Sequence, residues 1–100
     1  MACLSWSAEA EACLRDIHDF IARERPQAAV RVVLGILRVA EMLQDYPLAG
    51  SPYRLEEVGE LRMLRCGRYR IPYPLLAADH VIVLGVFHES MNLDRFLPQA

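Results

Sequence analysis

The sequence predicts a single α+β domain in which two antiparallel helices pack on one face of a small antiparallel sheet. Two amphipathic patterns fill residues 8–24 and 26–45, and short apolar runs follow over residues 60–88. Residues 46–59, rich in proline and glycine, are expected to be a loop between the two halves. A chain of 100 residues has room for one hydrophobic core, so we expect no second domain.

The first helix is expected to begin after Ser7, whose hydroxyl can cap the first turn. Glu9 and Glu11 follow, where carboxylates interact favourably with the helix dipole. Apolar residues then recur every three or four positions, at Ala10, Cys13, Leu14, Ile17, Phe20 and Ile21. This spacing predicts an amphipathic helix with one buried face.

The second helix is expected to begin at Pro26, because proline suits the first turn of a helix. Its apolar positions are Ala29, Val32, Val33, Ile36, Leu37, Ala40 and Leu43. The short link before Pro26 predicts an antiparallel pair of helices.

Two strands joined by a tight turn are expected next, at residues 60–65 and 68–73. The turn lies at Cys66-Gly67, where glycine supplies the positive φ that a hairpin needs. Pro72 and Pro74 favour an edge, a bulge or an early end for the second of these strands.

A third strand is expected at residues 80–87. It is apolar on both faces, which predicts the most central position in the sheet. Residues 4–6, or a partner chain, are the candidates to cover its free edge. Residues 89–100 lose the pattern and are expected to form a tail. Nothing else in the chain is expected to cover the sheet face opposite the helices, so that concave face is predicted to be a binding surface.

The charge balance excludes several function classes. All eleven basic residues are arginine, against thirteen acidic residues, which gives a net charge of -2. The lack of lysine excludes lysine bases, Schiff-base lysines and phosphate-loop lysines. An acidic chain also lacks the positive excess typical of nucleic-acid binding. The longest apolar run, residues 81–87, is far too short to span a membrane.

The cysteines indicate a reducing environment. Cys3, Cys13 and Cys66 are odd in number and have no metal-ligand or redox spacing, which favours free thiols. We therefore expect a cytoplasmic protein with no metal and no cofactor.

Four arginines, at positions 62, 65, 68 and 70, lie on the two paired strands within nine residues. Guanidinium groups suit bidentate contacts with phosphates or with the carboxylates of an acidic partner. The simpler alternative is charge that protects an edge hairpin from aggregation. We favour binding, because arginine without lysine suits bidentate contact better than mere solubility.

No catalytic motif is complete. His88, at the end of the third strand beside Glu89, could transfer a proton, although a local hydrogen bond is the simpler interpretation. No cysteine or serine has a visible base partner, so nothing supports nucleophilic catalysis and no catalytic residue is expected. Tyr69 and Tyr73 fit core positions with a hydroxyl at the rim, or positions that stack on a base.

Several segments have the order and spacing of a known family. They are Leu4-Ser5-Trp6-Ser7, Ala8-Glu9-Ala10-Glu11, Leu14-Arg15-Asp16-Ile17, Phe20-Ile21-Ala22, Arg25-Pro26-Gln27-Ala28-Ala29, the set Leu43, Pro47 and Gly50, Leu61-Arg62-Met63-Leu64, Tyr69-Arg70-Ile71-Pro72-Tyr73, and Val81 to His88. Together, over nearly the whole chain, they resemble the ParE toxins of the RelE/ParE superfamily, the toxin half of bacterial type II toxin–antitoxin pairs.

The resemblance implies one of two activities. ParE-like members inhibit DNA gyrase by protein contact, whereas RelE-like members cut messenger RNA on the ribosome with basic residues, many of them lysine, an arginine and a terminal tyrosine. This chain has no lysine, a net charge of -2 and no tyrosine after Tyr73. We therefore prefer the gyrase inhibitor, with a ribosome-dependent endoribonuclease or an inactive antitoxin-bound member as alternatives.

The resemblance also implies a hetero-oligomer with a ParD-like antitoxin, and no direct contact with nucleic acid or membrane. The disordered C-terminal segment of the antitoxin would fold on binding, as a helix along the helical hairpin and an extended piece over the open sheet face. The predicted antitoxin-binding residues are Leu14, Ile17, Ile21, Val33, Leu37, Arg62, Leu64, Arg65, Arg68, Arg70 and Tyr73. The predicted target-binding residues are Tyr69, His88, Glu89, Met91, Arg95 and Phe96.

Two departures from the family bear on potency. Met91 stands near the place where relatives often carry an arginine after the strand-ending histidine, and Arg95 is the next basic residue. Pro72 and Pro74 make the second strand of the hairpin less regular than usual.

Overall fold

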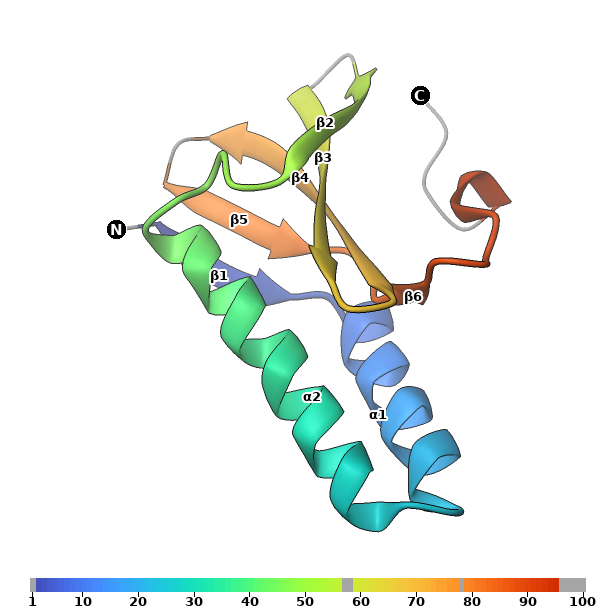
Figure 1. The fold of residues 1–100 in the computed structure, drawn as a ribbon. Coiled ribbons are helices and arrows are strands. Elements are labelled where there is room, and N and C mark those ends of the chain that lie inside the picture. Colours follow the sequence, from blue (N-terminus) through green and yellow to red (C-terminus); the bar gives the residue numbers. More distant parts are fainter. Residues whose placement is uncertain (1, 57–58, 78, 96–100) are drawn as a thin grey trace.

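A computed structural model describes residues 2–56, 59–77 and 79–95 of the chain. Two antiparallel helices pack under one face of a six-stranded sheet and extend beyond it (Figure 1). The elements are β1 (Cys3–Trp6), α1 (Ala8–Ala22), α2 (Pro26–Glu41), a 3-10 turn (Met42–Gln44), β2 (Ser51–Glu56), β3 (Gly59–Cys66), β4 (Tyr69–Ala77), β5 (His80–Val83), β6 (Phe87–His88) and a second 3-10 turn (Leu93–Arg95). The α+β prediction is confirmed.

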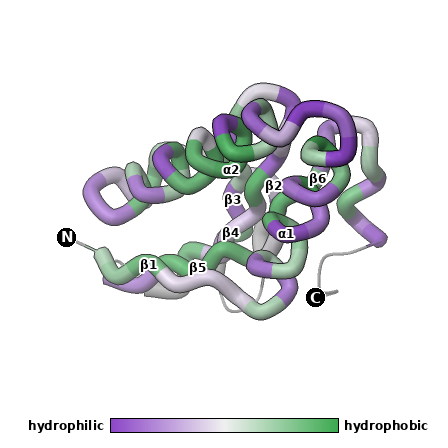
Figure 2. The backbone as a smooth tube through the Cα atoms, turned by 90° about the horizontal axis from the view of Figure 1, so that it is seen from below, coloured by the Kyte–Doolittle hydropathy of each residue, from purple (hydrophilic) through white to green (hydrophobic). Residues whose placement is uncertain are grey.

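The helices begin as the sequence indicated. The Ser7 hydroxyl accepts a hydrogen bond from the Ala10 amide at 3.0 Å, and Pro26 occupies the first turn of α2. Both helices alternate between hydrophobic and hydrophilic stretches along their length (Figure 2). Their apolar sides enter the main core, where Ala10, Ile36 and Ala40 are fully buried. No helix in the described ranges is long and apolar enough to cross a membrane.

The N-terminal strand covers the edge of β5, as predicted, but it does so in parallel. Leu4 lies opposite Val81 and Trp6 opposite Val83 in the β1–β5 register. The helical hairpin and the strands that follow it provide the long connection that a parallel pair requires. The sheet is therefore mixed, whereas a purely antiparallel sheet was expected.

The third predicted strand is not central and is not continuous. The strand order is β1-β5-β4-β3-β2, so β4 is in the middle and β5 is second from the edge. Residues 84–86 separate β5 from β6, which pairs with the other end of β4. The expected strand over residues 80–87 is therefore two short strands.

Proline in β4 contributes to this break. The Pro72 carbonyl accepts a hydrogen bond from the Leu84 amide at 3.0 Å, so the backbone of Pro72 faces residue 84 and not β3. Pro72 has no N–H to donate back, so the ladder loses a bond at the point where β5 ends. The β3 side stays paired throughout. The prediction that this strand lies at an edge or ends early is wrong, because β4 is the middle strand. The predicted irregularity is present, since the register between β4 and β5 shifts between Leu75 and Ala77, just after the prolines.

The predicted loop over residues 46–59 contains a strand. β2, over Ser51–Glu56, pairs with β3 and forms an edge of the sheet. Its Pro52 suggested a loop, but proline is tolerated in an edge strand because one side of that strand needs no ladder partner. The register shifts just after Pro52.

Residues 89–95 are not a free tail. Leu93 is buried to 1% exposure against Leu61 and Met63, which alternate along β3 on the face opposite the helices. The Tyr53 hydroxyl donates a hydrogen bond to the Asp94 carboxylate at 3.1 Å. The sheet face that was expected to be open is therefore partly covered by the C-terminal part of the chain itself.

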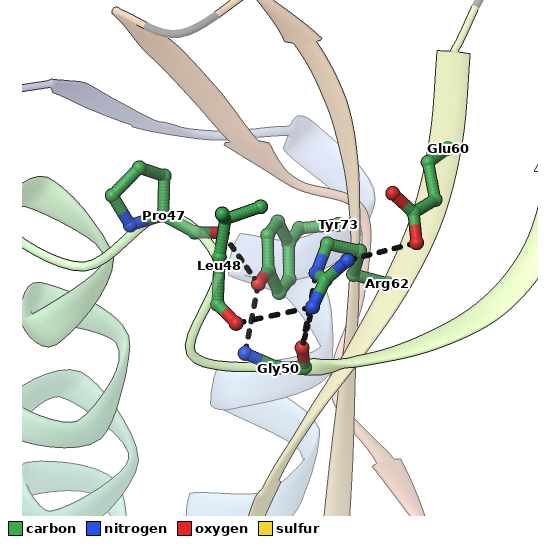
Figure 3. A network of polar contacts seen from close by, with 6 residues as sticks. All are labelled: Pro47, Leu48, Gly50, Glu60, Arg62 and Tyr73. Atoms are coloured by element: carbon green, nitrogen blue, oxygen red, sulfur yellow. Dashed lines mark hydrogen bonds and ion pairs between the residues drawn. The ribbon is translucent and has the colours of Figure 1, made fainter.

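A network of polar contacts fixes the loop between the helices and the sheet (Figure 3). The fully buried Tyr73 donates a hydrogen bond to the Pro47 carbonyl at 2.7 Å, and its hydroxyl accepts one from the Gly50 amide at 3.0 Å. The Arg62 guanidinium donates to the Gly50 carbonyl at 2.6 and 2.9 Å and to the Leu48 carbonyl at 3.1 Å. Both side chains therefore bond to the same short stretch of backbone.

Glycine is required at position 50 because the backbone passes so close to Tyr73. A Cβ atom there would lie 2.8 Å from the Tyr73 ring and hydroxyl, and 2.8 Å from the Met63 carbonyl oxygen. Any larger residue would push the loop away from the sheet. The leucine, proline and glycine spacing at residues 43, 47 and 50 thus has a structural basis, since Leu43 is itself fully buried.

We predict that Tyr73→Phe lowers the free energy of unfolding by about 1–3 kcal/mol, because it leaves the buried Gly50 amide and the Pro47 carbonyl without their partner. Urea denaturation measures the change. Tyr46→Phe is the matched control, because Tyr46 is 66% exposed and should change stability little. Equal effects of the two substitutions would contradict a structural role for the Tyr73 hydroxyl.

Candidate functional site

A largely apolar groove of about 930 Å³ lies between α1 and residues 84–91. Its lining residues are Ser7, Glu9, Cys13, Asp16, Ile17, Phe20, Tyr69, Leu84, Val86, Phe87, His88 and Met91. The capacity is that of a typical ligand or peptide site. The groove is therefore the candidate functional site of the described part of the chain.

One wall of the groove is a stripe along α1. Glu9, Cys13, Asp16 and Phe20 lie at positions i, i+4, i+7 and i+11, so they share one side of the helix over about three turns. Phe20 is 71% exposed, which is unusual for a phenylalanine. The stripe presents two carboxylates to solvent beside an uncovered aromatic ring.

The opposite wall contains an aromatic pair. The rings of Tyr69 and His88 meet edge to face, with centroids 5.8 Å apart and planes at 89°. His88 Nδ1 accepts a hydrogen bond from the Ser90 amide at 3.2 Å and lies 2.8 Å from the Ser90 hydroxyl oxygen. Because Nδ1 is an acceptor here, the neutral ring carries its proton on Nε2. The geometry agrees with the local hydrogen bond that was the simpler interpretation of this residue.

The strand hairpin holds the segment that carries this wall. Arg70 Nη2 donates hydrogen bonds to the Met91 carbonyl at 2.8 Å and to the Glu89 carbonyl at 3.4 Å. The Glu89 amide in turn donates to the Arg68 carbonyl at 2.7 Å. Met91 therefore reaches the groove because β4 binds the backbone around it.

The ionisable side chains that line the groove are few and mostly acidic. Its titratable lining consists of Glu9, Asp16, Cys13, Tyr69 and His88, with no arginine. No group of three metal-ligating side chains occurs within the described residues. The groove offers an apolar surface with an acidic side.

The structure brings together three of the six predicted target-binding residues, namely Tyr69, His88 and Met91. Glu89 is exposed beside the groove without lining it, and Arg95 is exposed in the second 3-10 turn. Phe96 lies outside the described residues. The predicted target-binding residues thus lie in two places, some in the groove and others in the C-terminal segment.

The predicted antitoxin-binding residues on the helices divide between two grooves. Leu14 and Val33 line a smaller groove of about 270 Å³ between the two helices, while Ile17 lines the larger one. Ile21 and Leu37 are half-buried on the same two helices. A partner segment along the helical hairpin could contact the first pair directly.

The four arginines of the strand hairpin do not form one surface, which corrects the prediction. Arg62 lies on the helix-facing side of β3, its side chain is 11% exposed, and it is paired with Glu60 at 2.8 Å in addition to its bonds to the loop. Arg65 and Arg70 lie directly opposite each other on the other face, and Arg68 is in the turn. Of these four arginines, Arg65 and Arg68 are exposed, whereas Arg62 and Arg70 are half-buried.

Two further residues of the antitoxin prediction are in the core. Leu64 is 6% exposed and Tyr73 is fully buried, both on the helix-facing side of the sheet. Neither presents a side chain to a partner in this structure. Leu64, Tyr73 and Arg62 therefore stabilise the fold, and we do not include them in the candidate docking surface.

The groove wall on α1 was not predicted from the sequence. Phe20 and Cys13 were assigned to the buried face because they follow the apolar period. On a helical wheel, however, Phe20 lies at one margin of an apolar arc about 120° wide, which is the place where a helix turns from core to surface. The marginal position of Phe20 could have indicated a surface role, whereas Glu9 and Asp16 gave no indication of a groove.

The fold and the groove define a small α+β protein with an apolar binding site. Comparison with known proteins then assigns it to a family. The family described as "ParE toxin of type II toxin-antitoxin system, parDE" matches residues 4–93. A protein named "Putative toxin Y4kP" from Sinorhizobium fredii is 34% identical over 94 residues, which cover 94% of this chain and 95% of that protein.

Solved structures have the same fold. A chain of the chromosomal ParDE system from P. aeruginosa matches with a TM-score of 0.73 and 24% identity, over 88% of this chain and 96% of that one. A chain of the RelBE2 toxin–antitoxin complex from Mycobacterium tuberculosis matches with a TM-score of 0.63 and 23% identity, over 87% and 96%. The chain described here belongs to the ParE toxin family of type II toxin–antitoxin systems. The resemblance that the sequence motifs indicated is thereby confirmed.

A titration reports whether the C-terminal segment is docked. Desolvation raises the pKa of the Tyr53 hydroxyl above its ordinary value of 10.0, and the hydrogen bond from Tyr53 to Asp94 and the charge of that carboxylate raise it further. The nearby Arg70 and Arg54 act in the opposite direction. A raised pKa means that the folded state holds this proton more tightly, so the associated stability is present below pH 10.0 and is lost as the pH rises through the raised value.

We predict that Asp94→Asn lowers the pKa of Tyr53 towards 10.0, because it removes the charge that disfavours tyrosinate. Ultraviolet absorbance of tyrosinate measures the titration, and the signal of Tyr53 is obtained by subtracting that of a Tyr53→Phe variant. Asp45→Asn is the control and should leave the curve unchanged. An unchanged curve for Asp94→Asn would show that the segment is not docked in solution.

Proposed function

We propose that this chain is a toxin that inhibits DNA gyrase by protein–protein contact and that a ParD-like antitoxin neutralises it in a cytoplasmic hetero-oligomer. Membership of the ParE family supports this function. The observation that carries it is the lining of the larger groove, which gathers Tyr69, His88 and Met91 among apolar and acidic side chains without one arginine.

This lining favours a protein target over messenger RNA. A site that receives a phosphate backbone needs cations to neutralise it, and the whole chain has a net charge of -2 and no lysine. An apolar groove instead suits a partner segment that buries its own apolar side chains. The proposed target is therefore a protein, and the ribosome-dependent nuclease is the alternative that the experiment must exclude.

We predict that the purified chain inhibits supercoiling by gyrase and that Phe20→Ala weakens this inhibition about tenfold, since a large ring at a contact centre contributes one to several kcal/mol. Supercoiling of relaxed plasmid over a range of toxin concentrations measures the effect. Val30→Ala is the matched control, because Val30 is also exposed, at 49%, but lies on α2 away from the groove.

A parallel assay with ribosome-bound messenger RNA tests the alternative. Untouched supercoiling together with cleaved message would assign the chain to the RelE-like nucleases and refute the proposal. If Val30→Ala weakens the inhibition as much as Phe20→Ala does, the groove is not the surface that contacts gyrase.

The antitoxin would contact the exposed arginines of the strand hairpin. Within the described residues, the side chains of Arg65 and Arg68 make no hydrogen bond or ion pair, and both are exposed near the turn of the hairpin. Acidic residues of a folding antitoxin segment could approach both without desolvating anything else. Arg70 belongs to the same end of the hairpin, but its guanidinium also holds the Met91 carbonyl.

We predict that the double substitution of Arg65→Glu and Arg68→Glu weakens binding of the antitoxin encoded beside the toxin by about tenfold or more, because two attractive contacts become repulsive. Isothermal calorimetry measures the affinity. The control is the pair Arg23→Glu and Arg25→Glu, which changes the net charge equally at exposed sites in the link between α1 and α2, where neither groove is lined. Unchanged affinity in the first variant would remove the electrostatic part of the proposal.

A further inference from the structure

We propose that the groove between α1 and residues 84–91 receives an amphipathic helix of the target protein, and that the apolar stripe of this helix is flanked by arginine or lysine. The inference rests on the proposed function only for the identity of the partner. The chemistry of the occupant follows from the groove itself, in three steps.

The first step is that the rims of the groove are apolar and uncovered. Phe20 on α1 is 71% exposed, and Met91 on the opposite side is 37% exposed. Exposed apolar surface that is contiguous with an apolar hollow typically marks a contact site. A partner that fills the hollow would cover both side chains at once.

The second step is the shape of the groove. The wall on α1 runs from Glu9 to Phe20, a rise of about 16 Å along the helix axis. That length matches about three turns of a partner helix, which would place apolar residues at i, i+4 and i+7 against the wall. A single inserted side chain would leave much of the stripe uncovered.

The third step is the sign of the charge. Glu9 and Asp16 are exposed on the α1 wall, and none of the lining residues is an arginine. Among the described contacts, no ion pair engages either carboxylate. A basic flank on the partner would meet both, whereas an acidic flank would be repelled.

The sign of the charge distinguishes this partner from the antitoxin segment. The acidic segment proposed above is drawn to Arg65 and Arg68 on the strand hairpin, and two carboxylates at the groove disfavour it there. The two surfaces thus select partners of opposite charge. The groove is assigned to the target, and the hairpin arginines to the antitoxin.

The experiment uses the full chain and two synthetic helical peptides as probes. The peptides share one stripe of leucine and phenylalanine at i, i+4 and i+7, but one carries arginine flanks and the other glutamate flanks. Fluorescence anisotropy of the labelled peptides measures binding. We expect the arginine peptide to bind at least tenfold more tightly, a difference that shrinks as salt is added.

Matched variants locate the binding on the chain. Glu9→Arg should weaken the arginine peptide about tenfold, while Glu11→Arg should not. Both residues are exposed in the first turn of α1, so both substitutions cost the same helix-dipole interaction, but only Glu9 lines the groove. Phe20→Ala should weaken both peptides, because it removes apolar contact and not charge, and Val30→Ala should weaken neither.

Four results would overturn the inference. The first three are equal affinity for the two peptides, tighter binding of the glutamate peptide, and equal effects of Glu9→Arg and Glu11→Arg. The fourth is a stable dimer of the unmodified chain that Phe20→Ala dissociates, because the groove would then bind a second copy of the chain. If the peptides bind as expected but the chain does not inhibit gyrase supercoiling, the inferred chemistry of the groove is supported and gyrase is rejected as the target.

Discussion

The contacts of Tyr73 and Arg62 with the loop at residues 47–50 determine how the two halves of this protein fit together. The loop carries the chain from the last helical turn into β2, so its position decides where the sheet begins relative to the helices. Tyr73 bonds to it from the middle strand and Arg62 from the neighbouring strand, and Gly50 allows the close approach. The Arg62 side chain is 11% exposed, and its bonds to the loop carbonyls and to Glu60 compensate for the loss of water around the guanidinium.

The same arrangement decides which arginines can serve binding. The Arg62 guanidinium donates its hydrogen bonds to the Gly50 and Leu48 carbonyls, so it is unavailable to a partner. The Arg70 guanidinium is partly engaged in the same way, through its bond to the Met91 carbonyl. Among the four arginines of the strand hairpin, Arg65 and Arg68 near the turn keep their donors for another chain. The fold thus uses one residue type for two purposes, internal support near the loop and external charge at the turn.

Local patterns predicted most of the fold. Ser7 and Pro26 mark helix starts through contacts within one turn, and Gly67 marks the hairpin with its positive φ of 58°. The break between β5 and β6 was not predictable from residues 80–87 alone, because Pro72, in the strand beside it, has no N–H to pair with residue 84. The groove escaped notice for a related reason. Its two walls come from α1 and from the segment that Arg70 holds, and only packing brings them together.

The interruption between β5 and β6 has a consequence for how such a toxin can diversify. Leu84 and Val86 line the groove from this interruption, and the Leu84 amide is bonded to the Pro72 carbonyl of β4. A change of the half-buried Leu84 side chain leaves that backbone bond in place and can reshape the wall. Val86 is 3% exposed in the main core, and a Cβ atom at Gly85 would meet the Phe87 ring, so folding constrains both of these positions. The shape of the groove can therefore change over evolution more readily at Leu84 than at its two neighbours.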